Sequence, residues 1–259
     1  MAKTYIISCL FLSVFCFFQA GAQIQPAASF GDDDTSTVVQ IDNERVSKAE
    51  FVWRMNGFRS ACFNFFMQQY NVSYNGPDFW DHSFNNITPM EWIRSRTLQQ
   101  LVEDKVKIKI MQQYGVLPGF DYTQFLKAFR DENEKRKILV EQGQVIYGIQ
   151  QFEAGSFYEY VLSNALLETE RRMLAVDPPS EKELQDYYGR IKNKELGYLP
   201  FRQVRENLRM QVAAARFHQL LMSKIKEAKI KVFPPGGGLH YRQTTPILNY
   251  PPGWHGRRG

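Results

Sequence analysis

A recurring pattern of helix starts constrains the fold of this chain more than any other feature. An oxygen-bearing side chain followed three residues later by Glu or Gln can form a capping box, which satisfies free backbone N–H groups of the first helical turn. Five such pairs each open a segment whose apolar residues recur with helical spacing. They are Ser47 with Glu50, Thr88 with Glu91, Asp121 with Gln124, Ser156 with Glu159, and Ser180 with Glu183. We therefore predict a mainly α-helical fold, with helices over residues 48–70, 89–114, 122–142, 157–175, 181–193 and 201–228.

Two short β segments flank these helices. In "VVQIDNERVS" an apolar alternation runs into an Asp42-Asn43 turn, which predicts a small β-hairpin near the N-terminus. "AKIKVF", which ends at residue 233, predicts a short strand after the long closing helix. A pairing of that strand with "VVQI" would bring the two ends of the helical domain together.

The two ends of the chain differ from the part between them. Residues 1–22 have a basic residue, Lys3, an apolar run, and small residues at Ala20 and Ala22, the pattern of a cleavable secretory signal. We expect cleavage near Ala22 and a location outside the cytoplasm, most simply the periplasm. Residues 23–37 predict a flexible leader, and residues 234–259 predict a disordered Pro/Gly-rich tail. One domain is expected over residues 38–233.

Charge and cysteine content exclude several classes of protein. The chain has 32 Lys and Arg against 27 Asp and Glu, and four of the basic residues lie outside residues 23–233. The body is therefore close to neutral, and we expect no nucleic-acid partner. Cys62 is the only cysteine after residue 22, so no internal disulfide is expected and the fold must rest on its core.

No catalytic or metal-binding motif is present in the sequence. It has no P-loop, no HExxH, no CxxC pair and no G-x-S-x-G, and its four histidines are scattered. We therefore expect no catalytic residues, no cofactor and no metal. No stretch after the signal is apolar enough for stable membrane insertion, which needs about 20 residues.

Apolar residues are concentrated in "GFRSACFNFFMQQY" and "GPDFWDHSFNNITPMEW". In one interpretation they are core, because the surrounding helices cover them. In the other, part of this face lines a groove that holds apolar side chains of another polypeptide, since aromatic and Met side chains suit adaptable binding. The candidate residues for this binding are Phe58, Phe63, Phe65, Phe66, Met67, Phe79, Trp80 and Trp92.

Several stretches resemble the N-terminal chaperone region of the SurA/PrsA group, the extracytoplasmic parvulin-type foldases. They include "VVQIDNERVSKAEF", "QQLVEDKVKIKIMQQYGV", "FYEYVLSNALLETERRML", "PSEKELQDYYGRIKNK" and "FRQVRENLRMQVAAARFHQLLMSKIKEAKIKV". The resemblance covers residues 38–233. It implies a SurA N-terminal-like chaperone domain that binds unfolded or nascent secreted or outer-membrane polypeptides without ATP.

A catalytic domain that is typical of this family has no place in the sequence. In the resembling proteins a parvulin prolyl-isomerase domain lies between the "SEKELQDYY" helix and the closing helix. Here "KELGYLPF", residues 194–201, joins the two helices directly. The isomerase residues of the family have no positions to map onto, so the resemblance implies a chaperone rather than an enzyme.

Two alternatives stay open. The chain could be a helical interaction subunit that docks a membrane or secretion assembly, with its aromatic side chains simply buried. It could also be a peptidyl-prolyl isomerase with an unrecognised site. Suppression of the aggregation of an unrelated unfolded protein favours the chaperone, one stable partner favours the subunit, and accelerated proline-limited refolding favours the isomerase.

Overall fold

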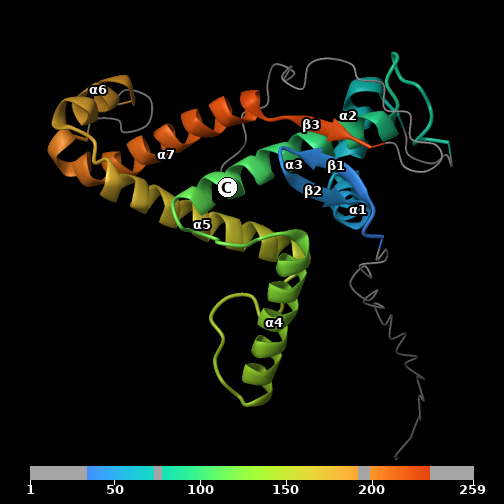
Figure 1. Ribbon diagram of the computed structural model, residues 1–259, viewed down its shortest axis with the longest axis horizontal. Helices are drawn as coiled ribbons and strands as arrows, with labels where there is room; N and C mark the ends of the chain where they lie inside the picture. Colours follow the sequence, from blue (N-terminus) through green and yellow to red (C-terminus); the bar gives the residue numbers. More distant parts are fainter. Residues whose placement is uncertain (1–33, 73–77, 192–198, 234–259) are drawn as a thin grey trace, which may run out of the picture.

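The computed structural model describes residues 34–72, 78–191 and 199–233, and within them the fold is mainly helical, as predicted (Figure 1). The predicted signal, residues 23–33 of the leader, the tail and most of "KELGYLPF" lie outside the described residues. The elements are β1 (Thr37–Ile41), β2 (Glu44–Ser47), α1 (Lys48–Gly57), α2 (Arg59–Tyr70), α3 (Pro89–Gln113), α4 (Tyr122–Glu141), α5 (Ala154–Val176), α6 (Glu181–Ile191), α7 (Phe201–Glu227) and β3 (Ile230–Val232).

The three strands form one antiparallel sheet in the order β2-β1-β3, which confirms both the hairpin and its pairing with the last strand. Val39 of β1 is the register partner of Val232. Asp42, in the turn after β1, has a φ of +52° and its Oδ1 accepts a hydrogen bond of 3.0 Å from the backbone N–H of Lys229. The beginning and the end of the helical region are therefore fixed to each other.

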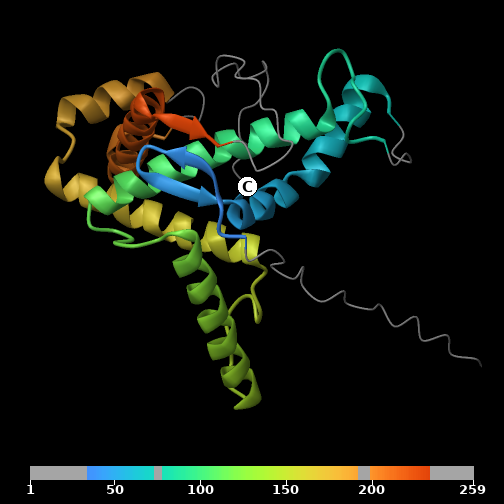
Figure 2. The ribbon, with the colours of Figure 1, turned by 45° about the vertical axis from the view of Figure 1, so that its right-hand side comes forward.

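Helix α3 is the centre of the fold, because α1, α2, α5 and α7 all pack on it. It begins with the predicted capping box of Thr88 and Glu91, both halves of which are formed. It ends at Gln113, and Gly115 stops it, because a φ of +72° at this glycine allows the N–H of Val116 to bond the carbonyl of Met111 at 2.9 Å. This is a Schellman stop, in which a glycine takes the left-handed conformation that other residues avoid. Figure 2 shows α3 running through the body of the molecule.

The predicted start of α5 is wrong. Ser156 and Glu159 do not cap this helix, which begins at Ala154 after Glu153 and has no side-chain cap. The preceding residue, Phe152, is buried, and its backbone is hydrogen-bonded to the side chain of Asn133. That anchor sets the start of the helix earlier, so Ser156 falls within its first turn.

The predicted helix over residues 48–70 is two helices. α1 ends at Gly57 and α2 begins at Arg59, with Phe58 between them at φ −94° and ψ −1°. Glycine is the weakest helix former apart from proline, which explains the break at this position. The aromatic residues assigned to one helical face therefore belong to α2 and to the turn before it.

The helices give the molecule three extensions from a central body (Figures 1 and 2). α6 and α7 pack against each other at one end around Leu184 and Leu208. α2 packs on the start of α3 at the other end. α4 projects from the body as an arm of about 30 Å, given a rise of about 1.5 Å per residue, and residues 142–153 return from its end to α5.

Candidate functional site

Seven of the eight residues predicted to bind a polypeptide come together where α2 meets the start of α3, and two of the seven are buried. Met67 is not part of this cluster. Phe66 is fully buried and Phe79 is 6% exposed, and together with Cys62 and Ile93 they form the centre of a separate apolar cluster. Burial raises the pKa of the Cys62 thiol to about 12, so this thiol is not a nucleophile at neutral pH.

Five of the other six residues pack around this buried centre, and Met67 is exposed on α2. Phe65 stacks on Trp92 with ring centroids 5.2 Å apart, and Phe63 lies 5.1 Å from Trp80. Phe58 packs against the cluster, and Met67 is 49% exposed. The predicted face is therefore a packed cluster with a partly exposed rim, and a role of that rim in binding stays a prediction.

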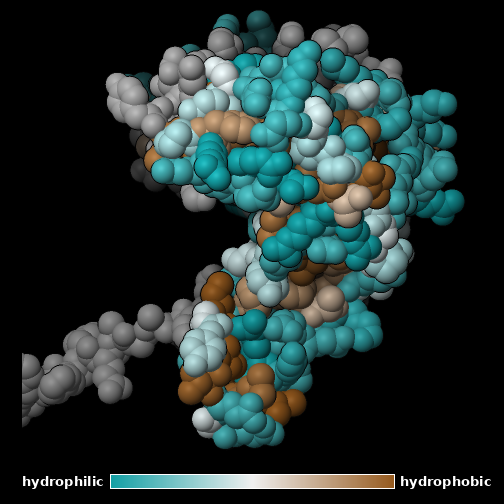
Figure 3. Space-filling model, turned by 90° about the vertical axis from the view of Figure 1, so that its left-hand side faces the viewer, coloured by the Kyte–Doolittle hydropathy of each residue, from teal (hydrophilic) through white to brown (hydrophobic). Residues whose placement is uncertain are grey.

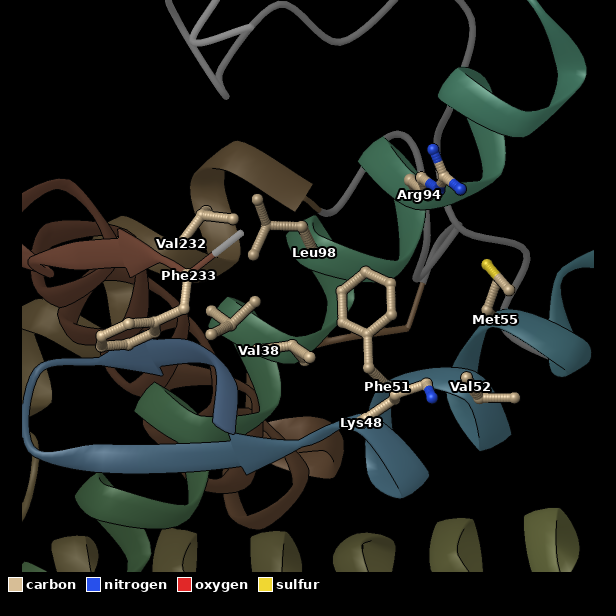
Figure 4. A pocket seen from close by; sticks show the side chains of 10 residues that line it. Val38, Lys48, Phe51, Val52, Met55, Arg94, Leu98, Val232 and Phe233 are labelled. Carbon is tan, nitrogen blue, oxygen red and sulfur yellow. The ribbon is translucent and has the colours of Figure 1, made fainter. Parts of the chain in front are cut away.

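A second apolar feature is a pocket beside the sheet with a volume of about 240 Å³. We call it the sheet pocket, and Figure 4 shows the ring of Phe51 standing between Val38 and Leu98 on one side and Met55 on the other. It is lined by Val38, Val39, Lys48, Phe51, Val52, Met55, Arg94, Leu98, Val232 and Phe233.

The chemistry of the sheet pocket suits an apolar side chain rather than a polar ligand. Eight of its ten lining residues are apolar, and the two basic ones are Lys48 and Arg94. The Nζ of Lys48 is held by Asp34 at 2.9 Å, so most of the lining that is left to contact an occupant is apolar, with Arg94 as the other basic residue. A pocket of this size is smaller than most small-molecule sites, which have volumes of about 300–1,000 Å³, and matches one or two side chains.

An ionic network holds the helix that forms one wall of the sheet pocket. Glu50 of α1 pairs with Lys105 of α3 at 2.8 Å, and Arg54 pairs with Asp104 at 3.0 Å. The guanidinium of Arg54 also lies 3.7 Å from the ring centre of Tyr158 in α5. These contacts fix α1 against α3 and α5, so the pocket wall is rigid. Glu50 thus pairs with Lys105 and does not complete the predicted capping box with Ser47, whose side chain accepts the Glu50 N–H.

A third apolar feature lies at the end of the α4 arm and was not predicted. Among the described residues ten large apolar side chains are exposed, and five of them lie between positions 138 and 149. We call these five the arm tip: Ile138, Val140, Val145, Tyr147 and Ile149. Val145 is 77% exposed and Tyr147 is 91% exposed. Figure 3 shows brown side chains gathered on the arm, with a hollow between the arm and the body above it.

Hydrogen bonds hold the arm tip in this exposed position. The Asn133 side chain donates to the carbonyl of Phe152 at 3.0 Å and accepts from its N–H at 2.8 Å. Arg136 donates to the carbonyl of Ile149, and its guanidinium lies 4.5 Å from the ring centre of Phe152. The returning segment is thereby fixed along α4, which keeps Val145 and Tyr147 at the surface.

One signal in the sequence could have found the arm tip. Residues 142–152, "QGQVIYGIQQF", contain five large apolar residues and no charge, yet they lack helical spacing and follow a predicted helix that ends there. A connection with this composition is expected either to pack or to bind.

Neither a metal-binding group of side chains nor a membrane-spanning helix is found among the described residues. In them no three His, Cys, Asp or Glu side chains are placed to hold a metal ion. No helix within residues 34–72, 78–191 and 199–233 combines the length and apolarity that crossing a membrane requires.

The comparisons with known proteins point to one curated relative. The chain is 21% identical over 207 residues to a protein from Bifidobacterium longum subsp. longum named "Chaperone for lacto-N-biosidase". The alignment covers 78% of this chain and 74% of that protein. No family model and no solved structure matches. A chaperone-like function is suggested by this distant relative, while the expected SurA/PrsA type is not shown by it.

Proposed function

We propose that this chain is an ATP-independent chaperone that acts outside the cytoplasm, most simply in the periplasm, and holds unfolded or nascent polypeptides. The observation that carries the proposal is the arm tip, where Val145 and Tyr147 are exposed on a projecting arm. Single exposed apolar residues are common on proteins, but a group of them gathered on one segment marks an interaction site. The distant relative, whose name describes a chaperone, supports the same conclusion.

The arm tip suits binding without an energy source. A chaperone without ATP must release its client spontaneously, which requires many weak and replaceable apolar contacts rather than one deep pocket. Branched and aromatic side chains on the arm tip offer such contacts, and the hollow in Figure 3 gives room for a chain between arm and body. The partly exposed rim around Phe65 and Met67 would add a second contact surface for the same client.

We propose this activity without prolyl isomerisation. The sequence between α6 and α7 is short, since α6 ends at Ile191 and α7 begins at Phe201. An isomerase domain of the parvulin type does not fit in that interval. A proline-limited refolding reaction should therefore proceed at the same rate with and without substoichiometric amounts of the protein.

The test is suppression of aggregation of an unrelated, chemically unfolded protein diluted from denaturant. The wild-type chain should suppress light scattering at a molar excess of a few-fold. The double substitution Val145→Asp with Tyr147→Asp should raise the concentration needed by about tenfold, because each charge replaces an apolar contact worth about 1 kcal/mol or more. Gln150→Asp with Gln151→Asp adds the same charge to the same exposed segment and is the matched control.

Two results would contradict the proposal. Failure of the wild-type chain to suppress aggregation at any excess would exclude a general chaperone. Equal suppression by the Val145/Tyr147 variant and by its control would show that binding occurs elsewhere. Stable 1:1 association with one partner, without suppression, would instead identify an interaction subunit.

A second candidate function is a chaperone dedicated to one secreted enzyme. It is favoured by the name of the relative, which refers to a single enzyme, lacto-N-biosidase. Co-production of this chain with a panel of secreted proteins from its source distinguishes the two. A general chaperone should raise the soluble yield of many of them modestly, whereas a dedicated one should raise the yield of a single protein strongly and leave the others unchanged.

A further inference from the structure

The sheet pocket lies where the described part of the chain ends. Val232 and Phe233 form part of its wall, and 26 residues, 234–259, follow Phe233 in the sequence. Any segment of those residues that can enter an apolar pocket is therefore attached directly beside one. The nearest walls are Val38 of β1, whose carbonyl accepts a hydrogen bond of 2.9 Å from the N–H of Phe233, and Leu98 of α3.

One segment of these 26 residues has the chemistry that the sheet pocket requires. Residues 243–254, "QTTPILNYPPGW", form the longest stretch after Phe233 without Lys, Arg, His, Asp or Glu. Three of its large side chains, Ile247, Leu248 and Tyr250, lie close together in the sequence, and Trp254 ends the stretch. In an extended chain alternate residues lie on one face, so Leu248 and Tyr250 can face the pocket together. Leu239 and Tyr241, by contrast, are separated by His240, and Arg242 follows directly.

The length of the connection allows this segment to reach the pocket. Twelve residues, 234–245, separate Phe233 from Pro246. They can span at most about 40 Å, given about 3.3–3.6 Å per residue. Three consecutive glycines at 236–238 permit the reversal of direction, because glycine adopts positive φ as readily as negative φ.

We infer that residues 245–250 of this chain occupy its own sheet pocket, with Leu248 and Tyr250 against Phe51, Val52 and Leu98. The attachment makes this occupancy favourable even if the contacts are weak. A short apolar peptide in a pocket of this size binds with a Kd on the order of 100 μM, whereas a short tether gives an effective concentration of millimolar order. The pocket would then be filled about nine-tenths of the time.

Residues 245–250 in the sheet pocket would compete with any other polypeptide for it. An apolar side chain of another polypeptide could enter only by displacing residues 245–250, so it would bind about tenfold more weakly than to the free pocket. The inference concerns the sheet pocket alone and does not depend on the proposed role of the arm tip.

The first test uses the full-length chain with photoreactive benzoylphenylalanine at position 248. Irradiation should link this position to α1 or α3, with the products mapped by mass spectrometry to peptides that contain Phe51 or Leu98. The linked species should run as a monomer. Links to other regions, links between two copies of the chain, or no link would each overturn the inference.

Two substitutions sharpen this measurement. Val52→Glu places a charge in the pocket wall and should abolish the link, whereas Ser60→Glu, at an exposed position of α2, should leave it intact. Thermal unfolding of both variants shows whether the body remains folded. Persistence of the link in a folded Val52→Glu variant would contradict the inference.

A second test does not depend on any change in the body. The full-length variant Leu248→Asp with Tyr250→Asp should have a free pocket, and a labelled peptide of residues 243–253 should bind it with a Kd on the order of 100 μM. The same peptide should bind the wild-type chain about tenfold more weakly. Equal binding to both, or no binding to the variant, would overturn the inference, and neither result bears on aggregation suppression by the arm tip.

Discussion

Four charged side chains meet where α1 contacts α3, and their burial makes them the most sensitive residues of the fold. The side chains of Glu50 and Lys105 are 6% and 8% exposed, and those of Arg54 and Asp104 are 10% and 3% exposed. Buried charges are costly without a partner, because removing an ion from water is penalised by several kcal/mol. Each charge in the network therefore offsets the cost of burying its partner's charge.

The losses of stability from removing the two members of a pair should not be additive. Lys105→Met leaves the Glu50 carboxylate buried and unpaired and should lower the free energy of unfolding by about 3 kcal/mol. Glu50→Gln with Lys105→Met should cost clearly less than the two single substitutions added together. Urea unfolding of the single and double variants at pH 7 measures this, and additive losses would contradict the account.

Asp42 makes the sheet sensitive to acid. A hydrogen bond from the Lys229 backbone lowers the pKa of its carboxyl below the usual 3.8, with help from the Lys109 ammonium at 3.1 Å. A carboxyl whose pKa is depressed in the folded state contributes stability above its unfolded pKa, and this contribution is lost as the pH falls through the folded pKa.

Asp42→Asn should therefore remove stability at neutral pH but not in acid. We expect a loss of about 1 kcal/mol at pH 7, from the charge-assisted hydrogen bonds, and a difference that shrinks as the pH drops below 3.8. Asn also tolerates the positive φ at this turn. Unfolding curves of wild type and variant from pH 7 to pH 2.5 test this, and a constant difference would contradict it.

The sequence predicted the role of Asp42 but not the ion pair of Glu50. Asp42 was placed in a turn, because its chemistry is local. Glu50 was assigned to a capping box, since a helix-start pattern is visible within four residues. Its pairing with Lys105 joins helices 55 positions apart and has no signature in a single sequence. A residue's local role, such as a place in a turn, can be predicted from the sequence. An ion pair between residues far apart in the sequence cannot.

The arm depends on one asparagine, because Asn133 bonds both the N–H and the carbonyl of Phe152. Asn133→Ala should loosen residues 142–151 while changing the global free energy of unfolding by about 1 kcal/mol or less. Hydrogen exchange measured by mass spectrometry should show faster exchange in this segment and unchanged exchange in α3. Equal acceleration in α3 would mean that the arm is part of the global folding unit.

The α2 cluster can be probed through its cysteine. Cys62 is fully buried, and its raised thiol pKa of about 12 makes the thiolate scarce at pH 8. A thiol reagent should therefore label the native protein at least about a hundredfold more slowly than the unfolded chain. Rapid labelling of the native state would show that α2 opens readily, and the rim around Phe65 would then become a stronger candidate for client binding.

Among the elements, those defined by their own sequence were predicted well. The helices that begin at Thr88 and Asp121 carry complete capping boxes, and both start as predicted. The start of α5 was wrong because a tertiary contact at Phe152 overrides the local signal. The arm tip was missed for a related reason: whether an apolar connection packs or stays exposed depends on which helices lie beside it.

At the scale of the whole molecule, a braced body carries an exposed apolar tip. A sheet that joins both ends of the helical region, together with α3, supports a projecting arm whose apolar tip lies far from the core. Rigid presentation lowers the entropy lost on binding, while the shallow surface keeps release easy. The aromatic side chains of the α2 cluster, by contrast, mostly pack against one another.

The central claim, that the arm tip contacts non-native polypeptides, is tested most directly by site-specific crosslinking to a client. Benzoylphenylalanine is placed at Tyr147, at Met67 on the α2 rim, or at the exposed Lys135 on α4, and each chain is irradiated with the same protein in its unfolded and native forms. We predict strong crosslinks from position 147 to the unfolded form, few to the native form, and few from position 135. Crosslinks to the unfolded form from position 67 but not from position 147 would contradict the claim.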